Sequence, residues 1–194
     1  MAFLFRLAIY DETFTHLIPV EEYLKLRSQG IYQWKPSLDD SGFLLKCQEK
    51  DWLGETINMG NLALIVRQME HALIRLTNGT EAIIRSGVLD RDVVPYMLFE
   101  YSSHNEIAVS LFTIDEPDVG MTFPFNGFSG KAEDLYAYVR DHRDEIMRQP
   151  EPSNRLFKRL VCPGIEFVSA MAQEAQFGRQ LFDVLGVPMV EGQS

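Results

Sequence analysis

Four histidines and two cysteines are the side chains of this chain best suited to bind a metal or to act as nucleophiles. They are His16, His71, His104, His142, Cys47 and Cys162. No two histidines are close enough in sequence to suggest a metal site, and the two cysteines match neither a zinc nor a redox spacing. His142 and Glu145 are one helical turn apart, but a metal site needs further ligands. We therefore expect no resident metal and no cofactor.

Motifs for phosphate binding or catalysis are also missing from the sequence. The chain has no Gly-x-x-x-x-Gly-Lys, no Gly-x-Gly-x-x-Gly and no His-Glu-x-x-His. The segment Gly127–Gly130 (Gly-Phe-Ser-Gly) lacks the Gly-x-Ser-x-Gly spacing of a nucleophile elbow. An enzyme whose groups meet only in the fold, for example around His142, Asp134 and Cys162, stays open as an alternative. The apolar stripe on which His142 falls favours instead a partly buried structural histidine.

Acidic turns and an aromatic loop are the best candidates for an interaction site. The chain has 28 acidic and 18 basic side chains, a formal net charge of −10. Such a charge repels nucleic-acid phosphates, and it attracts a basic protein and accelerates association with it. Aromatic side chains surrounded by acids suit a binding hot spot for such a partner. The predicted partner-binding residues are Asp39, Asp40, Asp115, Glu116, Asp118, Phe125 and Phe128. Taken singly, these acids are explained by solubility and the aromatics by capping of the sheet.

The length and hydropathy of the chain indicate a large core and a cytoplasmic protein. Hydrophobic residues make up 46% of the 194 residues, so the core needs no disulfide or metal to stabilise it. The apolar segment Met1–Tyr10 contains Arg6 and is followed by two acids, which indicates a strand and not a signal peptide. No apolar stretch approaches the roughly 20 residues of a membrane span. We expect free thiols and no binding to membranes.

The periodicity of apolar residues predicts alternating strands and helices. Strands are predicted over 3–9, 43–49, 81–85, 96–101 and 106–114, and helices over 19–29, 61–77, 131–148 and 164–185. The helix over 61–77 is the best defined, because its apolar stripe is continuous and Asn61 can cap its first amides. Gly178 should weaken the middle of the last helix. Hairpin-length connections favour antiparallel pairing, so we predict an α+β fold: an antiparallel sheet with amphipathic helices packed on it and a C-terminal helix.

A proline-rich segment near residue 150 predicts a division of the chain. We expect residues 1–149 to form an α+β core domain. Residues 150–194 should form a Pro-linked helical segment that packs on the core or on a second copy of the chain. The last helix has apolar residues on more than one side, which is typical of a buried helix. An oligomeric scaffold subunit, with a homodimer formed through this helix, is therefore a third interpretation.

The middle of the chain resembles small bacterial immunity proteins of polymorphic-toxin systems. The resemblance runs from about Phe43 to Ile114 and lies in a strand, the Trp52–Glu55 segment (Trp-Leu-Gly-Glu), the Asn61-Leu62 start of an amphipathic helix, and the strands that follow. It does not cover the first 40 residues or the Pro-linked tail. The resemblance implies a protein that binds a cognate toxin and neutralises it by direct contact. It implies no catalytic residues.

Overall fold

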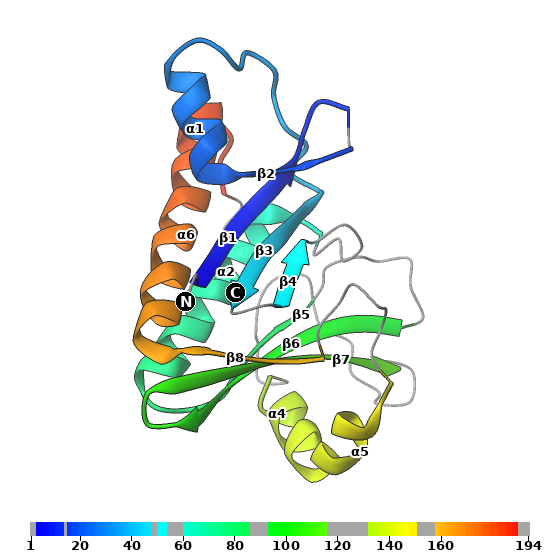
Figure 1. Cartoon of the computed structure of the whole chain (residues 1–194). Coiled ribbons are helices and arrows are strands. Elements are labelled where there is room, and N and C mark those ends of the chain that lie inside the picture. The colour runs from blue at the N-terminus through cyan, green and yellow to red at the C-terminus, as the bar shows by residue number, and fades with distance from the viewer. Residues whose placement is uncertain are drawn as a thin grey trace.

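The computed structural model describes residues 3–13, 15–47, 50–53, 60–85, 93–115, 132–150 and 158–189. They form two four-stranded antiparallel sheets, with strand orders β2-β1-β3-β4 and β5-β6-β7-β8 (Figure 1). The strands are β1 (Phe3–Tyr10), β2 (Leu17–Pro19), β3 (Ser41–Cys47), β4 (Lys50–Leu53), β5 (Ala82–Arg85), β6 (Val93–Ser103), β7 (Glu106–Asp115) and β8 (Arg159–Pro163). The helices are α1 (Val20–Ser28), α2 (Leu62–Thr77), α4 (Ala132–Asp141), α5 (Arg143–Arg148) and α6 (Gly164–Leu185). The α+β class is confirmed, with the strands divided between two sheets.

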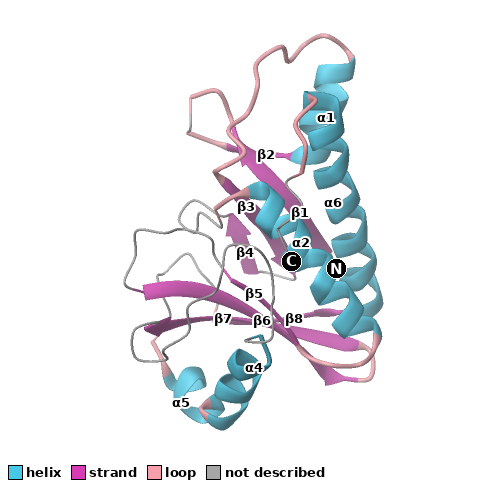
Figure 2. Ribbon diagram, turned by 180° about the vertical axis from the view of Figure 1, so that it is seen from behind, coloured by secondary structure: helices cyan, strands magenta, loops and turns pink. Residues whose placement is uncertain are grey.

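The main core lies where α2 and α6 pack against both sheets (Figure 2). Phe167 of α6 is at its centre. Its ring centroid is 5.3 Å from that of Phe5 in the first sheet and 5.4 Å from that of Phe99 in the second. Residues 150–194 also supply β8, which pairs with β7 and was not predicted from the sequence. The C-terminal helix therefore belongs to the same core as the two sheets.

The ends of α2 and α6 follow local rules that the sequence already shows. The side chain of Asn61 accepts hydrogen bonds from the backbone N–H groups of Ala63 and Leu64, as its position at the start of α2 predicted. Helix α6 begins directly after Pro163. It ends before Gly186, whose φ of 64° is the left-handed conformation that glycine adopts readily at such positions. The predicted bounds of both helices are therefore confirmed to within a residue.

Gly178 has a packing role that the sequence did not reveal. A Cβ at this position would lie 2.4 Å from Cγ2 of Val66 in α2 and 3.1 Å from Cδ2 of Leu7 in β1. Only a residue without a side chain lets α6 approach α2 and β1 this closely. Helix α6 runs without a break through this point. The glycine is thus required for the contact between the two main helices.

The predicted helix over 131–148 is two helices, which cover the outer face of the second sheet. Helix α4 ends at Asp141 and α5 begins at Arg143. Together with the outer face they form a second apolar cluster, which contains Ile83, Tyr96, Leu98, Phe112, Leu135, Tyr136, Val139 and Ile146. His142 lies at the break, where its side chain is exposed and stacks on Tyr138 with ring centroids 4.1 Å apart. The prediction of a partly buried His142 was wrong, because the helix does not continue through this residue.

Two strand edges in the second sheet are capped by side-chain amides in place of a further strand. Gln68 of α2 donates to the carbonyl of Arg85 at 3.0 Å and accepts from its N–H at 2.7 Å, at the outer edge of β5. Gln149, which follows α5, makes the same pair of contacts with Thr113 in β7, beyond the last residue that β8 covers. These contacts satisfy backbone groups that would otherwise offer an edge to another chain.

Candidate functional site

The predicted partner-binding residues do not form one cluster in the described structure. Asp39 and Asp40 lie in the turn before β3, and Asp115 is the last residue of β7 in the other sheet. Asp39 accepts a hydrogen bond at 3.0 Å from Nδ2 of Asn61, the residue that caps α2. Burial, followed by the negative charge of Asp40, raises the pKa of the Tyr10 phenol. These two aspartates thus lie against the end of β1 and the start of α2.

The other four predicted partner-binding residues, Glu116, Asp118, Phe125 and Phe128, lie outside the described residues. The aromatic loop and its acidic neighbours therefore stay a prediction.

The cysteine and the histidine of the alternative catalytic site lie on opposite faces of the second sheet. Cys162 is buried, and its side chain belongs to the main core. His142 is exposed at the break between α4 and α5, which cover the outer face. Asp134 lies in α4, and its side chain is outside the described residues. A sheet therefore separates the thiol from the imidazole. Across the described ranges, no group of three or more His, Cys, Asp or Glu residues could hold a metal ion.

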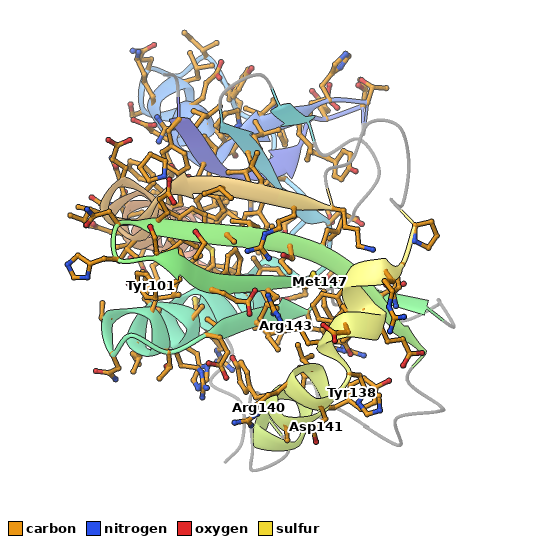
Figure 3. The ribbon with its side chains drawn as sticks, turned by 60° about the horizontal axis from the view of Figure 1, so that its bottom comes forward. Tyr101, Tyr138, Arg140, Asp141, Arg143 and Met147 are labelled. Carbon is orange, nitrogen blue, oxygen red and sulfur yellow. The ribbon has the colours of Figure 1, made fainter. Side chains whose placement is uncertain are left out.

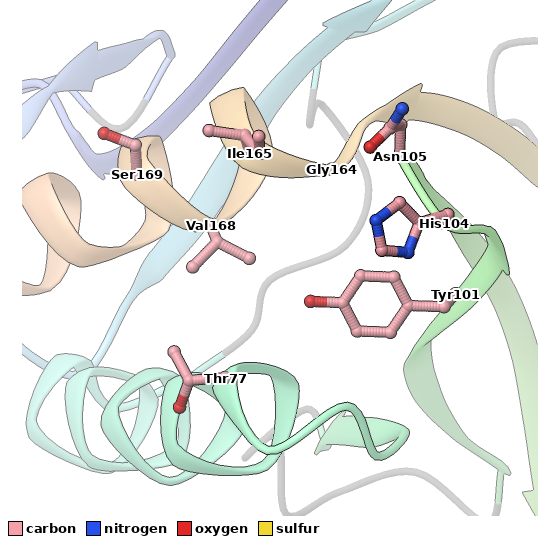
Figure 4. Close-up of a pocket in the computed structure, with 8 residues that line it drawn as sticks. All are labelled: Thr77, Tyr101, His104, Asn105, Gly164, Ile165, Val168 and Ser169. Carbon is pink, nitrogen blue, oxygen red and sulfur yellow. The ribbon is translucent and has the colours of Figure 1, made fainter.

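An open groove lies where the end of α2, the β6–β7 hairpin and the start of α6 meet (Figure 4). Its volume is about 490 Å³. The residues that line it are Thr77, Tyr101, His104, Asn105, Gly164, Ile165, Val168 and Ser169. Figure 4 shows the rings of Tyr101 and His104 projecting into the groove from the hairpin, opposite Ile165 and Val168 of α6. The groove thus depends on three segments that are far apart in the sequence.

Two hydrogen bonds to backbone carbonyls hold the parts of the groove in place. The N–H of Gly164 donates to the carbonyl of Asn105 at 2.7 Å, so α6 begins directly against the hairpin. A Cβ on Gly164 would lie 3.2 Å from that carbonyl oxygen, closer than most real Cβ contacts. The hydroxyl of Tyr101 donates to the carbonyl of Leu76 at 2.9 Å, in the last turn of α2. The hairpin is therefore tied to both helices, and the ring of Tyr101 has a defined orientation.

The groove exposes apolar surface. Ile165 is 80% exposed and Tyr101 is 40% exposed. Ile74, which is 61% exposed, precedes the lining residue Thr77 by three positions and so lies on the same face of α2. Tyr101 lies at the end of the second sheet away from α4 and α5 (Figure 3). Neighbouring apolar side chains on a rigid support suit the binding of another apolar side chain.

The polar groups at the groove suit binding better than acid–base catalysis. Among its lining residues, His104 and the hydroxyl of Tyr101 are the only ionisable groups. Two exposed carboxylates, Glu106 and Glu166, each follow a lining residue directly in the sequence.

Helix α2 spans about 24 Å at 1.5 Å per residue, so Asp39 and the groove lie at opposite ends of it. The strands predicted over 96–101 and 106–114 imply the hairpin between them, but no motif in the sequence indicated this surface.

A buried carboxylate whose pKa is raised lies away from the groove and has a structural role. Glu174 of α6 is fully buried, where it accepts hydrogen bonds from Nη1 of Arg6 at 2.8 Å and from the N–H of Leu7 at 2.9 Å. Burial raises the pKa of this carboxyl, and the two hydrogen bonds oppose the rise in part. The N–H of Leu7 lies on β1 just beyond the last residue paired with β2. Glu174 thus caps an edge of the first sheet, as the two glutamines do in the second.

Comparisons with protein-family models, with curated proteins and with solved structures found no match to this chain. None of the helices that the structure describes combines the length and hydropathy of a membrane-spanning segment.

Proposed function

We propose that this protein is an acidic binding protein of the immunity type, which neutralises a cognate protein toxin by direct contact in the cytoplasm. The observation that carries the proposal is the formal net charge of −10. The separation of Cys162 from His142 by a sheet also favours binding over catalysis by these residues. The resemblance of residues 43–114 to immunity proteins suggests the class of partner.

The charge gives the proposal a physical mechanism. Toxins that act on nucleic acids need basic surfaces to bind phosphates. An acidic inhibitor is attracted to such a surface over a distance set by the ionic strength, about 8 Å at 0.15 M salt. This attraction raises the association rate more than it strengthens the final contacts. A fast inhibitor would protect the producing cell before its toxin reaches a substrate.

Coexpression with the product of the neighbouring upstream gene tests the proposal. We expect a stable complex on size-exclusion chromatography, rescue of the growth of cells that make the toxin, and an association rate that falls as salt is raised. Light scattering on the protein alone would detect the homodimer that the third interpretation requires. A neighbouring gene for a metabolic enzyme, with no complex and no rescue, would contradict the proposed function.

A further inference from the structure

We infer that the groove formed by the end of α2, the β6–β7 hairpin and the start of α6 holds the partner, through an aliphatic side chain flanked by lysine or arginine. This inference rests on the proposed function and locates its contact surface. The groove is a different surface from the acidic turn at Asp39 and Asp40 that the sequence predicted, because Asp39 lies at the other end of α2.

Two exposed apolar side chains, Tyr101 and Ile165, line the groove, and a third, Ile74, lies on the same face of α2 as the lining residue Thr77. Ile74, Tyr101 and Ile165 are three of the six large hydrophobic side chains that are exposed in the described part of the chain. Val168 adds a partly buried surface at the floor between them. Ile165 is 80% exposed, so a partner that covers it removes a large apolar area from water. Complete burial of this side chain would strengthen binding by about tenfold or more.

The fixed ring of Tyr101 suits a binding hot spot. Its hydroxyl is already bonded to the carbonyl of Leu76, so a partner meets a ring that loses little freedom on binding. Tyrosine is among the residues most enriched at hot spots, where an aromatic face packs on an apolar side chain. The bond between Gly164 and Asn105 holds the opposite wall at a set distance. Much of the entropic cost of forming the site is thus met in the free protein.

The charge around the groove favours a basic partner. Glu106 and Glu166 are exposed beside the lining residues, and no lysine or arginine is among the described residues that line the groove. A cation on the partner would meet a carboxylate or the face of Tyr101. A second copy of this chain would instead bring the same two glutamates toward each other, which opposes pairing of copies through the groove. A basic segment with an aliphatic anchor is therefore the expected occupant.

Two synthetic peptides of one length test the inference on the full-length, isotope-labelled protein. Both carry leucines at the same helical positions, and the polar positions are lysine in one and glutamate in the other. We expect the leucine–lysine peptide to shift the NMR signals of residues 101–106 and 164–169 with saturable, salt-sensitive binding. The leucine–glutamate peptide should bind at least tenfold more weakly.

Two matched substitutions distinguish binding in the groove from general electrostatic attraction to the acidic protein. Ile165→Ser should weaken binding of the leucine–lysine peptide about tenfold. Val184→Ser should change it less than twofold, since Val184 is a 51% exposed apolar residue near the other end of the same helix. Both side chains face solvent, so both variants should unfold at the wild-type temperature.

Either of two results would overturn the inference. One is equal binding by the two variants. The other is a set of shifts centred on Asp39 and Asp40 or spread over the acidic surface without saturation. The coexpression experiment judges the proposed function separately: a neutralised toxin with no contact at the groove would refute only the inference. A groove that binds the peptide in a protein that neutralises no toxin would refute the proposed function.

Discussion

Replacing Gly178 by alanine tests the contact that brings α6 against α2. The added methyl group would lie 2.4 Å from Cγ2 of Val66. Carbon atoms pack best at about 3.5–4.0 Å, so this pair would overlap by about 1 Å. Val66 is buried, and a β-branched side chain in a helix keeps one strongly preferred rotamer. The backbone of one helix therefore has to move.

The expected loss of stability follows from two opposing terms. Alanine is favoured over glycine within a helix by about 1 kcal/mol. Forcing an extra methyl group into a packed core costs about 1–3 kcal/mol, and the short contact to a stiff valine puts Gly178→Ala in the upper part of that range. We expect a net loss of about 1–2 kcal/mol in the free energy of unfolding. For a chain of this size that corresponds to a fall of roughly 2–8 °C in Tm.

A double-mutant cycle with Val66→Ala, followed by urea unfolding, isolates the contact. Val66→Ala alone should cost about 2 kcal/mol through the cavity that it leaves. In the double variant, the methyl group added at 178 fills part of that cavity. The combined loss should therefore be smaller than the sum of the single losses by about 2 kcal/mol. Gln173 lies at an exposed position of α6. The difference in stability between Gln173→Ala and Gln173→Gly therefore measures the helix propensity of alanine relative to glycine without the contact to Val66.

Two results would refute this reasoning. If Gly178→Ala left the protein as stable as the wild type, the added methyl group would not clash with Val66 as the structure indicates. If the losses of the two substitutions simply added, the side chains at these positions would not be in contact.

Three further predictions concern the capped edges and the groove. Burial raises the pKa of Glu174, so the stability that its carboxyl contributes is complete below the ordinary value of 4.5 and is lost as pH rises through the folded-state pKa. Glu174→Gln should therefore gain stability relative to the wild type as pH rises above 4.5, and a constant difference in urea titrations at stepped pH would contradict this. Gln68→Leu removes the amide that bonds the carbonyl and N–H of Arg85 and should cost about 2 kcal/mol by urea unfolding, whereas a loss below 0.5 kcal/mol would show that water replaces the amide. Tyr101→Phe removes the bond to Leu76 and should cost about 1 kcal/mol and speed amide exchange at the end of α2, and unchanged exchange would refute a positioning role for the hydroxyl.

Local signals account for most of the elements that the sequence predicted correctly. Asn61 begins α2, and Pro163 and Gly186 bracket α6, because capping and backbone preference act within a few residues. The hairpin between β6 and β7 follows from two alternating strands with a short polar connection. The break at His142 was missed, since the apolar stripe continues through it and suggests a single helix.

The sequence by itself therefore determined the class of the fold, its main helices and the acidic charge of the surface. The tertiary structure alone decided that the strands divide into two sheets and that Gly178 meets Val66. It also decided that Ile165 faces solvent beside Tyr101. Periodicity shows which side of a helix is apolar, but exposure depends on what packs against that side. A groove built from three separate segments of the chain exists only once long-range pairing has set their positions.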